Sequence, residues 1–149
     1  FLMRIRMGYP HPESEKEILK SRVNGRLGSR IEAVLTGEDA LQLQRLCHQV
    51  QVEESLYDYI LAIVAATRQS PFIATGVSPR GSLFLLRAAQ ASAVIAGRDF
   101  CVPDDVKQMA LPVLAHRLVL RSRYSSQDKV ADEVENILAE ILEQTPVPY

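Results

Sequence analysis

The residues best suited to chemistry stand in the segment 76–82, which reads Gly-Val-Ser-Pro-Arg-Gly-Ser and opens the most apolar helix of the chain. Ser78 is a good N-cap, and Pro79 fits the first helical position, where proline's missing N–H costs nothing. Arg80 then falls in the first turn, where the helix dipole disfavours a cation by roughly 0.3–1 kcal/mol. Such a helix end normally attracts an anion. Two interpretations follow: Arg80 faces a shared anion such as a phosphate, or it bends back to a surface carboxylate.

Other candidate groups in the sequence are better explained by structure than by catalysis. Asp104 and Asp105 form an acidic pair, which the N-terminus of a helix accounts for. Cys47 and Cys101 lie among apolar neighbours, which indicates buried thiols in a reducing compartment. The three histidines are far apart without metal-ligand spacing, so no metal site is predicted. Because no Gly-x-x-x-x-Gly-Lys-Ser/Thr loop occurs, we expect this chain to supply one charged group to a reaction whose other parts lie elsewhere.

Composition narrows the class of protein. The 149 residues correspond to one domain or a little more, and the net charge of −1 gives no global field for nucleic acid or a membrane. No apolar run approaches a membrane span and no signal peptide pattern is present, which favours a cytoplasmic protein. Residues 1–30 hold seven basic side chains, whereas 128–143 hold six acidic ones. These two ends could pair, mark subunit contacts or form solvated faces.

The elements expected to position these residues are helices. Helical spacing and capping residues predict helices that start at Ser14, Thr36, Glu53, Pro79, Pro103 and Ser126. The third carries its apolar residues on one face, and the fourth, over 79–96, is apolar on almost every side and should be central in a bundle. Pro112 should end or kink the fifth helix near Leu111. Residues 24–36 and 69–77 are predicted to be irregular, and 116–123 to include a short extended segment.

The first seven residues alternate in the period of a half-buried strand. No partner strand is evident in the rest of the sequence, and a strand needs partners. We therefore expect a fragment that begins just before the last strand of a larger upstream domain.

Several motifs resemble the C-terminal part of MoxR-type AAA+ ATPases. They are Gly76-Val-Ser-Pro-Arg-Gly-Ser-Leu83, Leu85-Leu-Arg-Ala-Ala-Gln-Ala91, Gly97-Arg-Asp-Phe100, Val102-Pro-Asp-Asp-Val106 and Ala115-His-Arg-Leu118. Residues 1–10 resemble the stretch that follows the arginine-finger region of that family. The resemblance covers nearly the whole chain and is strong from 72 to 120 and weak from 24 to 52.

The resemblance implies an all-α fold, the helical-bundle lid of an AAA+ ATPase over residues 11–149, preceded in 1–10 by one short strand and a hinge left from the α/β core. Arg80 matches the sensor-2 arginine, which contacts the γ-phosphate of ATP. Tyr9 and Pro10 match the hinge near the adenine, and Ser78 and Pro79 complete the nucleotide-binding set. Arg80 could serve the nucleotide of its own or of a neighbouring subunit.

The resemblance also implies ATP and Mg²⁺ as cofactors of the parent protein, whose phosphate loop, magnesium-holding acids and arginine finger would lie upstream of Phe1. The implied partners are its own AAA+ core and neighbouring subunits in a homo-oligomeric ring, a hexamer, together with von Willebrand A domain proteins. The implied work is chaperone-like, the maturation of partner proteins or metal insertion into them. Two positions depart from the family pattern: Gly81 stands where alanine is usual, and Val102 replaces a capping threonine.

A free-standing helical module that binds proteins or DNA is the alternative. A recognition helix should present several basic residues on one exposed face. The helix over 79–96 offers only Arg80 and Arg87, so no nucleic-acid partner is predicted.

Overall fold

The computed structural model describes residues 1–23, 32–121 and 127–148. Its helices are α1 (Pro12–Val23), α2 (Gly37–Gln49), α3 (Glu54–Gln69), α4 (Pro79–Ile95), α5 (Pro103–Leu114) and α6 (Gln127–Gln144), with a 3-10 turn η1 at Ala115–Arg117 and two short strands, β1 (Ile73–Thr75) and β2 (Val119–Leu120). The prediction of an all-α fold is confirmed. The predicted irregular residues 24–31 and the predicted start of the last helix at Ser126 lie outside the described residues.

Helix α3 buries the face that the sequence predicts. Its buried residues recur at spacings of three and four and are Leu56, Tyr59, Ile60, Ile63, Val64 and Thr67. Each fully buried aliphatic side chain of this kind stabilises the fold by about 1.5–3 kcal/mol. This face packs against α4, α5 and α6 and forms one side of the core.

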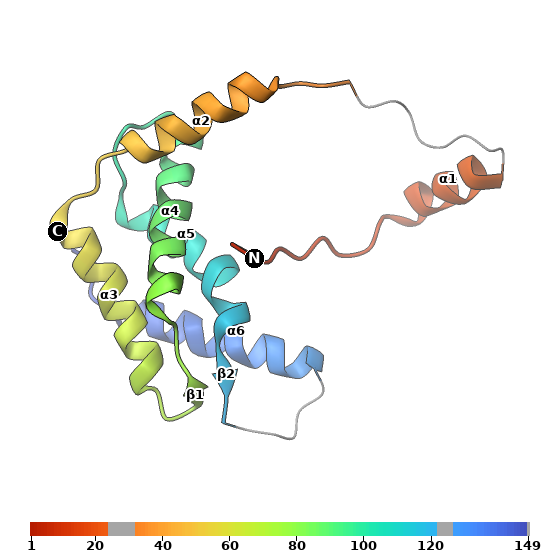
Figure 1. Cartoon of the computed structure of the whole chain (residues 1–149). Coiled ribbons are helices and arrows are strands. Elements are labelled where there is room, and N and C mark those ends of the chain that lie inside the picture. The colour runs from red at the N-terminus through yellow and green to blue at the C-terminus, as the bar shows by residue number, and fades with distance from the viewer. Residues whose placement is uncertain (24–31, 122–126, 149) are drawn as a thin grey trace.

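Helix α4 is central, as predicted, and packs against α2, α3 and α5 (Figure 1). Its buried side is made mostly of small residues, namely Gly81, Ala88, Ala89 and Ala93, around the fully buried Leu85. Small residues let neighbouring helices approach closely. Helix α6 completes the bundle by packing on α3 and α5.

A short antiparallel ribbon closes the end of the bundle where α4 begins (Figure 1). Ile73 of β1 pairs with Leu120 of β2, and both side chains are buried. The prediction of an irregular 69–77 is wrong at β1, because a three-residue strand leaves no periodic pattern and its partner lies far along the chain. The extended segment predicted within 116–123 is present as β2.

Pro112 does not end helix α5. The helix continues three residues past Leu111, to Leu114, so the alternative of an end near Leu111 is wrong, whereas the alternative of a kink stays a prediction. Proline removes one i→i−4 hydrogen bond, but Val113 and Leu114 are both fully buried, and this burial favours continuing the helix.

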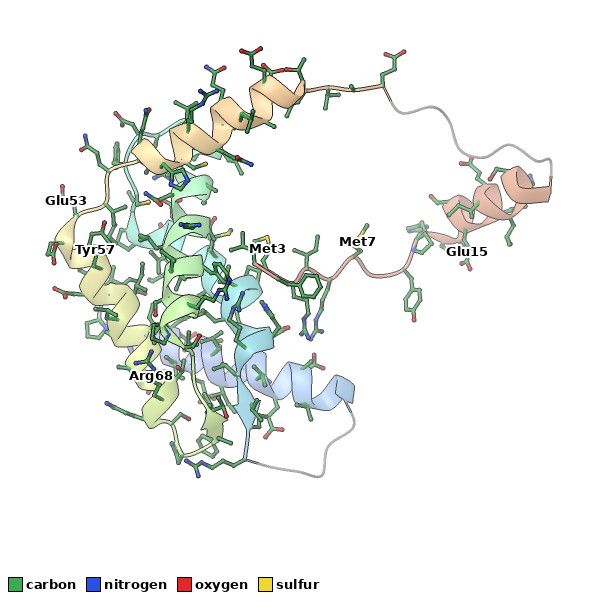
Figure 2. All side chains as sticks on the ribbon, in the orientation of Figure 1. Met3, Met7, Glu15, Glu53, Tyr57 and Arg68 are labelled. Atoms are coloured by element: carbon green, nitrogen blue, oxygen red, sulfur yellow. The ribbon has the colours of Figure 1, made fainter. Side chains whose placement is uncertain are left out.

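The N-terminal segment, residues 1–11, forms no strand, so the strand predicted over 1–7 is wrong here. A strand is stabilised by a ladder of hydrogen bonds to a neighbour, whereas with the rest of the described chain this segment makes one long-range backbone hydrogen bond, from Arg4 N–H to the Pro112 carbonyl at 2.8 Å. The segment leads away from the bundle through Met7 to Glu15 in α1 (Figure 2). Its apolar side chains stay exposed, as do Ile18 and Leu19 of α1 and Leu41, Leu43 and Leu46 of α2.

Candidate functional site

The loop before α4 is held by the last turns of α3. The Val77 N–H donates to Oγ1 of Thr67 at 3.1 Å, and Nε of Arg68 donates to the Val77 carbonyl at 2.8 Å. Thr67 in turn donates from Oγ1 to the Val64 carbonyl at 2.6 Å. The Val77 side chain is itself buried. Both backbone groups of Val77 are therefore satisfied, and the three residues that follow start from a defined position.

Two glycines allow this close packing. A Cβ on Gly76 would lie 2.8 Å from Cα of Arg68, so the backbone of α3 leaves no room for a side chain there. A Cβ on Gly81 would lie 2.5 Å from Cγ1 of Val77. The sequence suggests only a helix-propensity cost for Gly81, but the structure adds a steric reason for it. The glycine lets α4 approach the loop that carries its own N-terminus.

Ser78 and Pro79 occupy the predicted positions at the start of α4. Ser78 is the N-cap and Pro79 is in the first turn, although the Ser78 side chain makes no capping hydrogen bond. The Ser78 carbonyl accepts from the N–H of Gly81 at 2.8 Å. Ser78, Pro79 and Arg80 are all exposed, and the first turn of α4 contains no acidic residue. We call this helix end open, because it is exposed to solvent and no carboxylate of its own first turn balances the positive end of the helix dipole.

The Arg80 guanidinium lies over the ring of Phe84, one turn further along α4, with 5.6 Å between Cζ and the ring centroid. None of the ion pairs among the described residues includes Arg80. The interpretation that Arg80 bends back to a surface carboxylate is therefore not supported in this part of the chain. An exposed guanidinium beside an open helix N-terminus is suited to binding an anion.

The structure does not bring Tyr9 and Pro10 to this site. Both residues are exposed, and they follow Gly8, whose φ of 67° gives a bend that favours glycine. No hydrogen bond among the described residues joins them to Ser78, Pro79 or Arg80. Their assignment to nucleotide binding stays a prediction.

The acidic pair at the start of α5 has a structural role. Asp104 is exposed, whereas Asp105 is buried and accepts two hydrogen bonds from Arg98, at 2.7 and 2.8 Å. Burial alone would raise the pKa of Asp105, but hydrogen bonds from Arg98, from the Val102 N–H and from Ser92 together lower it. Asp105 is ionised and fully engaged, so the two acids do not act as an acid–base pair. No cluster of three or more His, Cys, Asp or Glu residues in the described segments could hold a metal ion.

A cavity of about 340 Å³ lies between the N-terminal segment and the bundle, and its charged lining residues are Arg4, Arg6 and Glu135. Arg6 is paired with Glu135 and Asp132, both at 3.0 Å, and Arg4 lies 3.6 Å from Glu135. The two charged ends of the sequence thus pair at these residues, one of the alternatives that the charge distribution leaves open. Because the arginines are already neutralised, this cavity is a poorer anion site than the start of α4.

Sequence reasoning missed four residues that shape the site, namely Thr67, Arg68, Phe84 and Arg117. Arg117 also lies over Phe84, with 4.7 Å from Cζ to the ring centroid. The Ala115-His-Arg-Leu118 motif was a signal for Arg117, but no spacing rule connects it with a helix thirty residues earlier. Tertiary packing alone reveals these partners.

Comparison with known proteins identifies the class. The family model described as the AAA lid domain matches residues 65–141, which span α4, α5, the ribbon and most of α6. The chain therefore belongs to the AAA lid domain family.

The relatives make the assignment more specific. The chain is 35% identical to chaperone MoxR1 of Mycobacterium tuberculosis over 99% of its own length and 40% of that protein. It is 37% identical to YeaC of Bacillus subtilis over 99% of its own length and 45% of that protein. Protein MoxR of Methylorubrum extorquens is 30% identical over 68% of this chain and 33% of that protein. The resemblance to the lid portion of a MoxR-type AAA+ ATPase is confirmed.

A solved structure agrees with this assignment. The crystal structure of a protein from Cytophaga hutchinsonii, described as an ATPase, superposes with a TM-score of 0.79 and 27% sequence identity, over all of this chain and 47% of that one. The chain spans less than half the length of these relatives. None of the helices in the described segments combines the length and apolar character that a membrane crossing needs.

Proposed function

We propose that this chain is the lid of a ring-forming MoxR-type AAA+ ATPase and that Arg80 is its sensor-2 arginine. The observation that carries the proposal is the exposed Arg80 guanidinium at the open start of α4, with no carboxylate partner among the described residues. Residues 1–10 would end the nucleotide-binding core and residues 11–149 would form the lid. Tyr9 and Pro10 would act as the hinge near the adenine.

ATP would supply the phosphoryl group that is transferred to water, with Mg²⁺ held by residues outside this lid. The planar guanidinium of Arg80 matches the oxygens of a phosphate in a forked geometry that lysine lacks. Ser78 and Pro79 would place the first turn of α4 beside the same phosphate. Such charge-assisted contacts stabilise a transferring phosphoryl group by several kcal/mol, on the order of the largest catalytic contributions.

The chaperone naming of MoxR1 supports a chaperone-like task for the whole protein. We assign to it the maturation of partner proteins or metal insertion into them, with von Willebrand A domain proteins as partners. The working form would be a cytoplasmic homo-oligomeric ring, a hexamer, in which Arg80 acts in its own subunit or on a neighbour's nucleotide.

The test is Arg80→Ala in the full-length protein that contains this chain. We expect ATP hydrolysis to fall by about tenfold or more, because a charge-assisted contact to the transferred group is lost. Nucleotide binding, measured with a fluorescent ATP analogue, should stay largely intact. Arg87→Ala is the matched control, since Arg87 is an exposed arginine of the same helix. Unchanged turnover of Arg80→Ala would refute the role.

The alternative function, a free-standing module that binds proteins or DNA, makes a different prediction. Binding carried by phosphate contacts would weaken steeply as salt rises. Fluorescence anisotropy of labelled duplex DNA with the 149-residue chain distinguishes the two, and we expect no salt-dependent binding.

A further inference from the structure

Two arginines from different elements share one aromatic ring. Phe84 of α4 lies under the guanidinium of Arg80 at 5.6 Å and under that of Arg117 at 4.7 Å. Phe84 is only partly exposed, and Cδ of Arg117 would lie 3.5 Å from a Cβ built on Gly81. The side chain of Arg117 therefore crosses the first turn of α4. Movement of Arg117 would therefore displace the Phe84 ring, which also contacts Arg80.

Arg117 also holds the N-terminal segment. Its guanidinium donates to the carbonyl of Leu2 at 3.0 Å and to the carbonyl of Phe1, while its Nε donates to the Val113 carbonyl at 2.8 Å. None of the ion pairs among the described residues includes Arg117. Among the described residues the Arg117 guanidinium therefore contacts main-chain oxygens and the Phe84 ring rather than a carboxylate.

We infer that Arg117 is a positioning residue, which ties the N-terminal segment to the Phe84 ring and thereby orients the Arg80 guanidinium. The inference rests on the proposed function of Arg80. The chain of contacts runs from the Phe1 and Leu2 carbonyls to Arg117, then to Phe84, then to Arg80. A shift of the N-terminal segment against the bundle would change the support under the arginine that meets the phosphate.

The chemistry of arginine suits this task and that of lysine does not. A planar guanidinium can stack on a ring and donate several hydrogen bonds in fixed directions, whereas an ammonium is a compact charge without a plane. Two cations beside one ring also repel each other, so an anion bound at Arg80 would relieve that repulsion.

The test measures steady-state ATP hydrolysis by the full-length protein with Arg117→Lys and with Phe84→Leu, each alone and in an Arg80→Ala background. Alone, each should lower kcat by about three- to tenfold, with KM changed by less than about twofold. In the Arg80→Ala background, each should lower kcat by less than about twofold, because the residue that they position is already gone. Phe100→Leu is the matched control, since Phe100 also lies beside an arginine, Arg98, but in another part of the fold.

The outcomes separate the two proposals. Equal losses of kcat in both backgrounds would show that Arg117 and Phe84 act independently of Arg80. An unchanged kcat in the single variants would show that neither residue contributes to turnover. Either result overturns the inference while leaving Arg80 in its role. If Arg80→Ala itself leaves turnover unchanged, the proposed function fails and the inference falls with it. A merely structural Arg117 would lower the melting temperature without this dependence on Arg80. If Arg117→Lys does not fold, Phe84→Leu decides, because it leaves the hydrogen bonds of Arg117 in place.

Discussion

Helices α4 and α5 begin with similar residues but differ in whether an acidic side chain balances the positive end of the helix dipole. Each has a proline in its first turn and an N-cap residue whose side chain makes no capping hydrogen bond, Ser78 in α4 and Val102 in α5. The first turn of α5 contains two aspartates, whereas that of α4 contains no acid and carries Arg80.

The start of α5 is closed by the protein itself. Asp105 accepts from the Val102 N–H at 2.9 Å, from Ser92 Oγ of α4 at 3.0 Å and from Arg98. The buried Asp105 carboxylate thus binds the N–H of the N-cap residue and links the two helices. In the described part of the chain no carboxylate meets the start of α4, and its first residues are exposed. We infer that α5 uses its N-terminus for stability and α4 keeps its N-terminus for a ligand.

The largest expected effect is on stability, from removing the Asp105 carboxylate at the start of α5. Asp105→Ala should lower the free energy of unfolding by about 2–4 kcal/mol, because Arg98, Ser92 and the Val102 N–H lose a buried hydrogen-bond partner. Urea unfolding of the 149-residue chain measures the effect. Asp104→Ala, at the exposed neighbouring position, should cost no more than about 1 kcal/mol. Equal losses for the two variants would contradict the distinction drawn between them.

The same carboxylate predicts a pH dependence. The pKa of Asp105 is lower in the folded chain than its ordinary value of 3.8, so its stabilisation is complete above about pH 4 and is lost as the pH falls through the folded pKa. Wild type should therefore exceed Asp105→Asn in unfolding free energy at pH 7, and the gap should narrow in acid. A gap that stays constant down to pH 2 would argue against an ionised Asp105.

A middle-sized effect should come from the glycine that lets α4 approach its own entry loop. Gly81→Ala gains about 1 kcal/mol of helix propensity. It also forces Val77 to move, and such overpacking typically costs about 1–3 kcal/mol, which equals or exceeds the gain. We expect a net loss of about 1 kcal/mol in urea unfolding. Gly37→Ala is the control, because nothing lies within 4 Å of a Cβ placed at Gly37, so this substitution should not destabilise α2. Stabilisation by Gly81→Ala would show that the contact with Val77 relaxes freely.

The smallest expected effect is at the open end. Arg80→Ala removes an unfavourable charge from the helix N-terminus and also its contact with Phe84, and each term is at most about 1 kcal/mol. The two oppose each other, so the unfolding free energy should change by less than about 0.5 kcal/mol in the same urea assay. A loss as large as that of Asp105→Ala would make Arg80 a structural residue and remove the contrast between the two helices.

Much of the bundle could be predicted from the sequence, because helices and their caps depend on residues only three or four positions apart. The buried face of α3 follows from residues three and four apart, and Thr36 caps α2 at the predicted start, in a capping box whose Thr36 N–H donates to Asp39 at 2.8 Å. The errors arise where distant partners decide. Ile73 forms a strand because Leu120 is beside it, and the first seven residues form none because no strand in the described segments pairs with them.

The candidate site divides in the same way. The sequence by itself determined that Ser78, Pro79 and Arg80 open a helix, because capping preference and proline geometry act between neighbours along the chain. Only the tertiary structure decided that Arg80 lacks a carboxylate partner among the described residues, that Thr67 and Arg68 hold its loop, and that Phe84 joins it to Arg117. The physical reason is that hydrogen bonds and ring contacts depend on distance in space, and no periodicity along the chain records them.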